Sequence, residues 1–84
     1  MKYQKIPALN GFELIKILKK DGWVEHRKTT YGIALKKRVD DRTRVTIVPK
    51  TRATLPTGIL MAILWEKQTG LGRAGFLALL NKFR

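Results

Sequence analysis

Cysteine is absent from this chain of 84 residues, and histidine occurs only once, as His26. Without cysteine the chain can form no disulfide and offers no thiolate nucleophile. A tetrahedral zinc site draws most of its ligands from cysteine and histidine, which this sequence cannot supply. The adjacent acidic pair Asp40-Asp41 has the pattern of a hairpin turn rather than of a metal site. We therefore expect no bound metal and no cofactor.

Long apolar runs are missing as well. A helix that crosses a membrane needs about 20 mostly apolar residues, and no segment of that length in this chain is free of charged residues. The N-terminus is basic, but no apolar stretch of the kind that marks a secretory signal peptide follows it. These absences predict a single domain over residues 1–84, located in the cytoplasm and not bound to a membrane.

Acidic residues are scarce. The chain has 18 Lys and Arg against 6 Asp and Glu, which gives a net charge of +12. Nine of the basic residues lie between Arg27 and Arg52, where the only acidic residues are Asp40 and Asp41. A basic cluster of this kind attracts polyanions, of which nucleic acid is the commonest. The alternatives are a surface kept soluble by its charge and a surface neutralised by an acidic partner.

The first helix has clear start and stop signals. Asn10 is a good N-cap, and Glu13 three residues later completes a capping-box pattern. Apolar residues then recur at helical spacing to about Lys20, where Asp21-Gly22 ends the pattern.

Three strands are expected next, over residues 23–28, 31–39 and 43–48, with turns at Thr29-Thr30 and at residues 40–42. Side-chain alternation places Val45 and Ile47 on one face of the third strand and Arg44 and Thr46 on the other. Pro49 ends this strand.

Two helices close the chain. The first is expected from Thr57, as its N-cap, through Trp65 to about Gln68, and the second over residues 73–82 with Phe76, Leu77 and Leu80 inward. The order helix–strand–strand–strand–helix–helix predicts an α+β fold. Its antiparallel three-stranded sheet has helices on one face and an open face that carries the polar side of the strands.

Several short motifs follow one another along the chain. They are Gly22-Trp23 after the first helix, a basic hairpin, Val48-Pro49 at the end of the third strand, Leu55-Pro56-Thr57-Gly58-Ile59-Leu60 at the start of the next helix, Ile63-Leu64 within it and Thr69-Gly70-Leu71 after it. Each alone is ordinary core patterning or turn chemistry, but the ordered set resembles the HicA family over about residues 11 to 80. HicA proteins are small bacterial and archaeal toxins that cut messenger RNA, and they have a double-stranded-RNA-binding-domain-like fold.

The resemblance implies a partner and a substrate. The partner is a HicB-type acidic antitoxin that covers the basic face and the active-site residue, and the substrate is messenger RNA. The candidate RNA-binding residues are Arg27, Lys28, Lys36, Lys37, Arg38, Lys50 and Arg52. The rival hypotheses are a non-catalytic RNA- or DNA-binding module of the same fold and a basic protein whose only partner is another protein. Residues 36–38 also fit a solvated basic face.

The resemblance places the family's catalytic histidine on the second strand, and in this chain the corresponding residue is Tyr31. An imidazole can take a proton from a ribose 2′-hydroxyl near neutral pH, whereas a phenol keeps its own proton at pH 7. Three accounts are open: cleavage is lost, by drift or by a substitution in the cloned gene; Tyr31 acts together with other groups; or His26 takes over. The plain alternative for Tyr31 is a strand aromatic packed against the sheet.

By strand alternation His26 shares a face with Val24 and Lys28, and its plain interpretation is a half-exposed strand residue. Trp23 and Trp65 are expected to be aromatics of the core or its rim, and they do not form a base-stacking platform.

Overall fold

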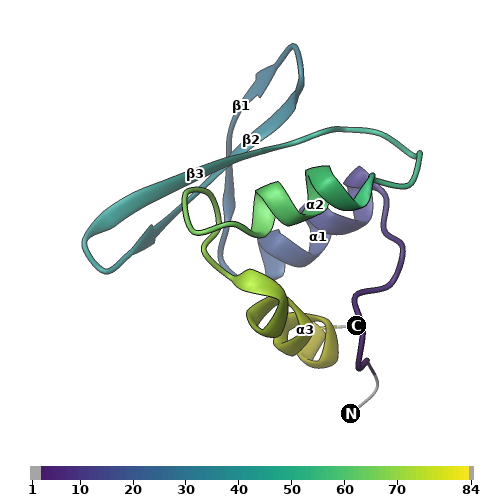
Figure 1. Cartoon of the computed structure of the whole chain (residues 1–84). Coiled ribbons are helices and arrows are strands. Elements are labelled where there is room, and N and C mark those ends of the chain that lie inside the picture. The colour runs from purple at the N-terminus through teal and green to yellow at the C-terminus, as the bar shows by residue number, and fades with distance from the viewer. Residues whose placement is uncertain (1–2, 84) are drawn as a thin grey trace.

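The structure of the chain, a computed structural model, describes residues 3–83. The elements are α1 (Gly11–Lys20), β1 (Val24–Thr29), β2 (Gly32–Val39), β3 (Arg42–Val48), α2 (Thr57–Leu64) and α3 (Gly72–Phe83). The three strands form one antiparallel sheet in the order β1-β2-β3 (Figure 1). The α+β fold and the element order predicted from the sequence are therefore confirmed.

The start of α1 is held by the predicted capping box. The backbone N–H of Glu13 donates to Asn10 Oδ1 at 2.8 Å, and the backbone N–H of Asn10 donates to Glu13 Oε1 at 3.0 Å. These two bonds satisfy donors that the first turn of a helix leaves unpaired. Asp21 caps the other end, and Gly22 then adopts a φ of +103°, which a residue without a Cβ tolerates.

The helices cover one face of the sheet, as predicted. Helices α1 and α2 lie next to the sheet, and α3 packs against both of them on the side away from it (Figure 1). Ile33, Leu35 and Val48 point from the sheet into this core, where they meet the apolar sides of the helices. The opposite face of the sheet is open to solvent. None of the helices within residues 3–83 is both long and apolar enough to cross a membrane.

The two faces of β3 are exchanged relative to the prediction. Thr46 points toward the helices and is 2% exposed, whereas Val45 and Ile47 lie on the open face and are 45% and 40% exposed. The segment after α2 explains the exchange because it supplies polar partners. The Thr46 hydroxyl donates to the Gln68 side-chain oxygen, so its burial leaves no unpaired donor.

Helix α2 is shorter than predicted. It begins at Thr57 with Pro56 as the N-cap residue, so the prediction that Thr57 is the N-cap is wrong. The helix ends at Leu64 rather than near Gln68, because the chain folds back there. The Thr69 hydroxyl and backbone N–H both donate to the carbonyl oxygen of Ile63, at 2.9 and 3.1 Å, and thereby take over a carbonyl at the helix end.

Helix α3 agrees with its prediction to within one residue at each end. Phe76 and Leu80 are fully buried, as expected. Leu79 is the third buried side chain, and Leu77, which was predicted to point inward, is only half-buried. The buried stripe therefore lies slightly further around the helix than the sequence pattern indicated.

A glycine at the start of α1 allows the segment after β3 to pass close by. A methyl group on Gly11 would overlap the carbonyl oxygen of Pro49, and the Gly11 N–H donates to the carbonyl oxygen of Thr51 at 3.0 Å. We expect Gly11→Ala to lower the free energy of unfolding by about 2–3 kcal/mol, because backbone must move to admit the methyl group. Chemical denaturation measures this loss.

Gly58→Ala is the matched control for Gly11→Ala. Gly58 also lies in the first turn of a helix, but a methyl group there would meet nothing within 4 Å. Because alanine favours helix, this control should be neutral or stabilising by about 0.5–1 kcal/mol. Equal effects of the two substitutions would show that the close approach at Gly11 does not matter.

Candidate functional site

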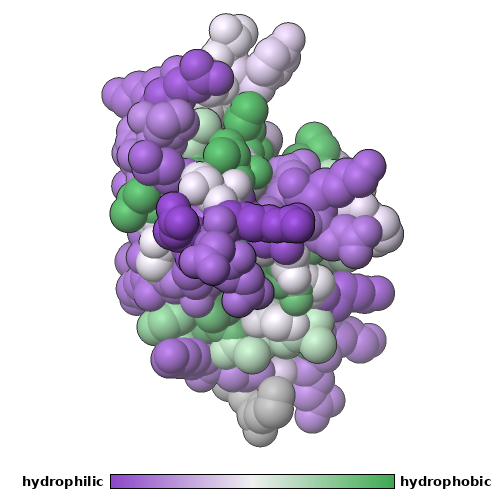
Figure 2. All heavy atoms as spheres, turned by 90° about the vertical axis from the view of Figure 1, so that its left-hand side faces the viewer, coloured by the Kyte–Doolittle hydropathy of each residue, from purple (hydrophilic) through white to green (hydrophobic). Residues whose placement is uncertain are grey.

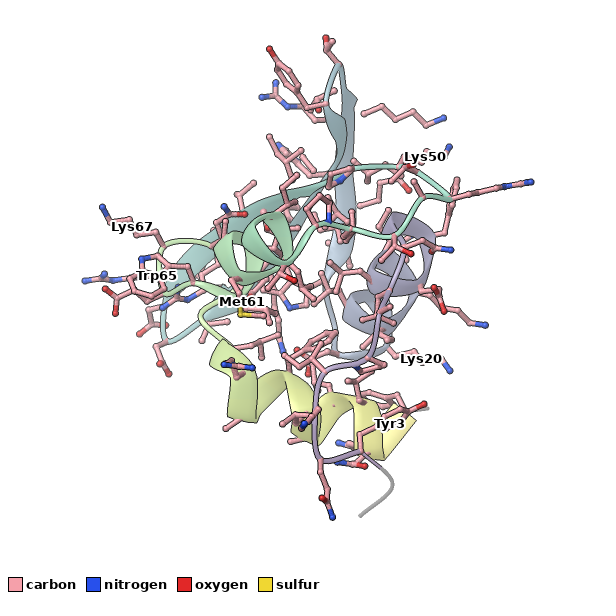
Figure 3. The ribbon with its side chains drawn as sticks, turned by 45° about the vertical axis from the view of Figure 1, so that its right-hand side comes forward. Tyr3, Lys20, Lys50, Met61, Trp65 and Lys67 are labelled. Carbon is pink, nitrogen blue, oxygen red and sulfur yellow. The ribbon has the colours of Figure 1, made fainter. Side chains whose placement is uncertain are left out.

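A cleft of about 380 Å³ lies at one end of the sheet, where the β1–β2 turn meets the segment that follows β3. It is lined by residues 28–33 from the hairpin and residues 49–51 from the segment. The hairpin projects away from the helices (Figure 1). Figure 3 labels Lys50 on the segment that follows β3. The cleft therefore brings together two parts of the basic region that are about 20 residues apart in the sequence.

Gly32 allows the two sides of the cleft to approach each other. It has a φ of +150°, and a methyl group there would overlap the carbonyl oxygen of Val48. The turn itself is held by Thr29, whose hydroxyl donates to the Gly32 carbonyl oxygen at 3.1 Å. The same hydroxyl oxygen accepts the Tyr31 backbone N–H at 3.2 Å. The walls of the cleft are thus set by backbone contacts as well as by side chains.

Tyr31 lies in the turn and not on the second strand, which begins only at Gly32. The prediction of a strand position is therefore wrong, and so is the alternative of an aromatic packed against the sheet. The Tyr31 side chain is 80% exposed. Tyr31 is one of the residues that line the cleft, and its side chain is open to solvent.

His26 does not line the cleft. It is the extra residue of a bulge in β1, because Glu25 pairs with Leu35 while Arg27 pairs with the next residue of β2, Ala34. A bulge shifts the alternation of side chains along a strand. Val24 and Lys28 consequently lie on opposite faces, so the prediction that they share a face with His26 is wrong.

The predicted RNA-binding residues fall into separate groups. Lys28 and Lys50 line the cleft, and Arg52 lies exposed two residues further along the same loop. The structure places the remaining four on the sheet: Arg27, Lys36 and Arg38 on the open face, and Lys37 on the face toward the helices. The first group can act on one ligand within the cleft, and the three cations of the open face form a wider basic surface.

The open face of the sheet mixes cations with aliphatic side chains. Arg27 and Ile47 flank Ala34 in one cross-strand row, and Val24 and Val45 flank Lys36 in the next. Figure 2 shows part of the molecule's surface, in which hydrophilic side chains predominate and hydrophobic ones form smaller areas between them. Such a face offers positive charge to a polyanion.

Lys37 has a partner within the chain. Its ammonium group lies 3.1 Å from Asp21 Oδ2, and its side chain is 30% exposed. This ion pair joins β2 to the end of α1. One of the three basic residues at positions 36–38, Lys37, is therefore already paired with an acidic residue of the protein.

Sequence reasoning missed the threonines of the cleft. Thr29, Thr30 and Thr51 line it together with Lys28 and Lys50. Hydroxyl and ammonium groups are common donors to phosphate oxygens. A signal for them is present in the sequence, because threonines lie directly beside the lysines on both sides of the cleft.

A comparison with models of known protein families identifies the family of this chain. The family model described as the HicA toxin of bacterial toxin–antitoxin systems matches residues 11–71. The chain belongs to the HicA toxin family. The match spans α1, the whole sheet and α2, and it includes every residue that lines the cleft. The family predicted from the sequence motifs is thus confirmed, and membership implies an antitoxin as partner. No curated protein and no solved structure matches the chain.

In this HicA protein the cleft is equipped for binding more than for proton transfer. Two lysines and three threonines can donate hydrogen bonds to an anion. Residues 28–33 and 49–51 include no carboxylate and no imidazole, and their one aromatic hydroxyl belongs to Tyr31. The chemistry available in the cleft is therefore recognition of an anionic group, with a phenol beside it that can donate a hydrogen bond or stack on a ring.

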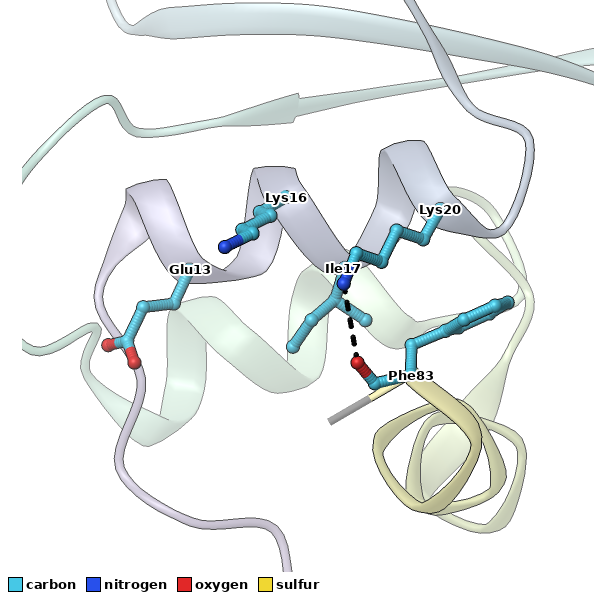
Figure 4. Close-up of a pocket in the computed structure, with 5 residues that line it drawn as sticks. All are labelled: Glu13, Lys16, Ile17, Lys20 and Phe83. Carbon is cyan, nitrogen blue, oxygen red and sulfur yellow. Dashed lines mark hydrogen bonds between the residues drawn. The ribbon is translucent and has the colours of Figure 1, made fainter.

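A second hollow of this HicA protein lies between α1 and the end of α3 (Figure 4). Glu13, Lys16, Ile17, Lys20 and Phe83 line it, and Lys20 Nζ donates to the Phe83 carbonyl oxygen at 3.4 Å. Its charges are of both signs, so it attracts an anion less than the cleft at Tyr31 does.

Proposed function

We propose that this HicA toxin binds messenger RNA in the cytoplasm, with a phosphate in the cleft and the flanking nucleotides along the open face of the sheet. The observation that carries the proposal is the convergence of Lys28 and Lys50 on one cleft beside Tyr31. Arg27, Lys36 and Arg38 extend the positive surface beyond the cleft. This surface recognises phosphate and shape, as double-stranded-RNA-binding domains do.

The reaction that we propose for this site is metal-independent cleavage of RNA by attack of a ribose 2′-hydroxyl. With Tyr31 in the site, the protein catalyses this reaction weakly or not at all. The attack needs a base that is partly unprotonated near pH 7. Tyr31 occupies the place where the family has its histidine, and a phenol does not meet this need. A non-catalytic RNA- or DNA-binding module of the same fold is the second candidate function, and the absence of imidazole and carboxylate from the cleft lining favours it.

The partner is a HicB-type antitoxin with an acidic surface. A net charge of +12 on 84 residues favours an acidic protein as the neutralising partner. By covering the basic strands and Tyr31, the antitoxin would compete directly with RNA. Arg52 and Lys37 complete the set of candidate RNA contacts, with Lys37 available only when it leaves Asp21.

The salt dependence of RNA binding tests the proposal. We expect the logarithm of the binding constant to fall linearly with the logarithm of salt concentration, with a slope of about −4 if five cations contact phosphates. Fluorescence anisotropy of a labelled RNA between about 50 and 200 mM salt measures this slope. A slope near zero would leave only the hypothesis of a basic protein with a protein partner.

Two further arms of the same assay separate the candidate functions. DNA of the same sequence should bind less tightly if the 2′-hydroxyl is recognised. Incubation of the RNA with the protein and a metal chelator shows whether any cleavage occurs. RNA binding without cleavage, even in Tyr31→His, would identify the chain as the non-catalytic module.

A further inference from the structure

The outward side of α2 is apolar. In a chain with 29% charged residues, the eight residues of this helix include no charged residue at all. Leu60, Ile63 and Leu64 are buried, but Ile59 is 43% exposed and Ala62 is also exposed. A surface helix normally carries polar residues on its outward side, and one that is apolar all round is normally covered.

Trp65 continues this apolar side beyond the end of the helix. It is 60% exposed, although tryptophan is among the residues that gain most from burial. Figure 3 shows Trp65 and Lys67 projecting from the same end of α2. Ile59, Ala62 and Trp65 are spaced by three residues, so they lie along one side of the helix.

The backbone that carries Trp65 is firmly held. Its N–H donates to the Ala62 carbonyl oxygen at 3.2 Å, and its own carbonyl oxygen accepts the N–H groups of Gln68 and Gly70, both at 2.9 Å. Arg44 on β3 donates to the carbonyl oxygens of Glu66 and Gln68. An exposed indole on a fixed backbone loses little conformational freedom when a partner covers it.

A groove adjoins this side of α2. It lies between α2 and the segment that precedes α1, with a volume of about 500 Å³. Its apolar lining residues are Ile6, Pro7, Ala8, Leu9, Leu55, Leu60 and Met61. The charged residues that line it are Lys5 and Arg73, and no acidic residue does. Met61, which is half-buried, joins the groove to the outward side of the helix.

We propose that the α2 surface, formed by Ile59, Met61, Ala62 and Trp65 with the adjoining groove, docks an acidic segment of the antitoxin that presents an apolar stripe. The proposal rests on the proposed function only in taking the antitoxin as the partner. It adds an apolar contact on the helical side of the molecule to the electrostatic contact expected on the basic strands.

Charge and chemistry select this occupant over two others. Aliphatic side chains such as Ile59 cannot bind phosphate, so the outward side of α2 does not suit a nucleic-acid backbone. A second copy of the chain would bring two charges of +12 together, which opposes self-association. The charged neighbours of the surface are Lys5, Lys67 and Arg73 against the exposed Glu66, so positive charge predominates around it. An acidic protein segment with apolar side chains therefore suits both the surface and its neighbours.

The test compares two α2 variants with a matched control. Trp65→Ala removes the exposed indole, and Ala62→Glu places a carboxylate in the middle of the surface. Ala78→Glu makes the same change at an exposed position of α3. The ligand is the purified HicB-type antitoxin of this toxin, and titration calorimetry measures its affinity. Circular dichroism and thermal melting check that each variant folds.

We expect Trp65→Ala and Ala62→Glu to weaken antitoxin binding at least about thirtyfold, which is typical of residues at the centre of an interface. Ala78→Glu should change it less than about threefold, as charges outside an interface do. RNA affinity should change equally in Ala62→Glu and Ala78→Glu, because both alter the net charge by the same amount. Loss of antitoxin binding in a chain that binds no RNA would support the docking surface while refuting the proposed function.

Four results would overturn the inference. One is that the parent chain does not bind the antitoxin at all. The first of the other three is antitoxin binding by both α2 variants within about threefold of the parent chain. The second is an RNA affinity that falls much further in Ala62→Glu than in Ala78→Glu, which would make α2 an RNA surface. The third is a parent chain that sediments as a dimer and becomes a monomer in Ala62→Glu, which would assign the surface to a second copy.

Discussion

Tyr31→His is expected to raise metal-independent RNA cleavage by about two orders of magnitude or more, the usual contribution of a general base. An imidazole with an ordinary pKa near 6.5 is largely unprotonated at pH 7 and can accept the proton of a 2′-hydroxyl. The site favours the change because Tyr31 is 80% exposed in a turn, so its replacement disturbs no packing. Lys28 and Lys50 already line the same cleft and can hold the phosphate.

Cleavage of a defined transcript in the presence of a chelator measures the effect, and growth arrest on induction provides an independent readout. The cleavage rate of Tyr31→His should rise with pH through about 6.5 and then level off, because only the neutral imidazole acts as a base. A parent chain that already cleaves strongly, and loses this activity in Tyr31→Phe, would show that the tyrosine itself is functional.

His26→Ala is the companion control for Tyr31→His. His26 lies at the bulge of β1 and does not line the cleft, so its loss should leave the activity of Tyr31→His unchanged. If parent activity survives Tyr31→Phe and disappears in His26→Ala, the catalytic role belongs to His26.

The double variant Lys28→Glu, Lys50→Glu is expected to weaken RNA binding about a hundredfold. An ion pair near the protein surface contributes about 1 kcal/mol or more, and a charge reversal replaces this attraction by a similar repulsion. Two such charge reversals in one cleft, weakened by the screening of salt, account for the expected hundredfold loss of RNA affinity. The slope of the salt dependence should become less steep by about 1.5, since each phosphate contact contributes about 0.7–0.9.

Lys16→Glu, Lys82→Glu is the matched control, because it changes the net charge by the same amount at two exposed helical positions outside the cleft. We expect it to weaken RNA binding less than about fivefold, through the long-range field alone. Equal losses in the two double variants would show that RNA responds to total charge and that the cleft has no special role. Reversal of Lys36 and Arg38 tests the open face in the same way.

The features that the sequence predicted correctly depend on neighbours along the chain. The capping box of Asn10 and Glu13 is a contact across three residues, and the Asp40-Asp41 turn needs only residues that tolerate a positive φ, which both adopt here. The antiparallel meander follows from three strands joined by short turns. The HicA resemblance is visible in the sequence for the same reason, because each family motif lies within a short segment.

The features that the sequence predicted wrongly depend on distant partners. Thr46 faces inward because Gln68, 22 residues away, accepts its hydroxyl hydrogen bond. The bulge at His26 depends on how β1 pairs with β2, which no pattern within β1 reveals. Alternation along one strand cannot tell which side the rest of the chain will cover, and for β3 this decided the faces.

The candidate site shows the same division. The sequence alone predicted the family and the fold class, which are both confirmed, and it gives the excess of positive charge directly. That Tyr31 takes the place of the family's histidine stays a prediction. Packing in three dimensions brings Lys28, Tyr31 and Lys50 to one cleft and leaves the outward side of α2 uncovered. The physical reason is that two glycines, Gly11 and Gly32, let the segment after β3 pass against the start of α1 and β2, and no pattern within one segment specifies such a close approach.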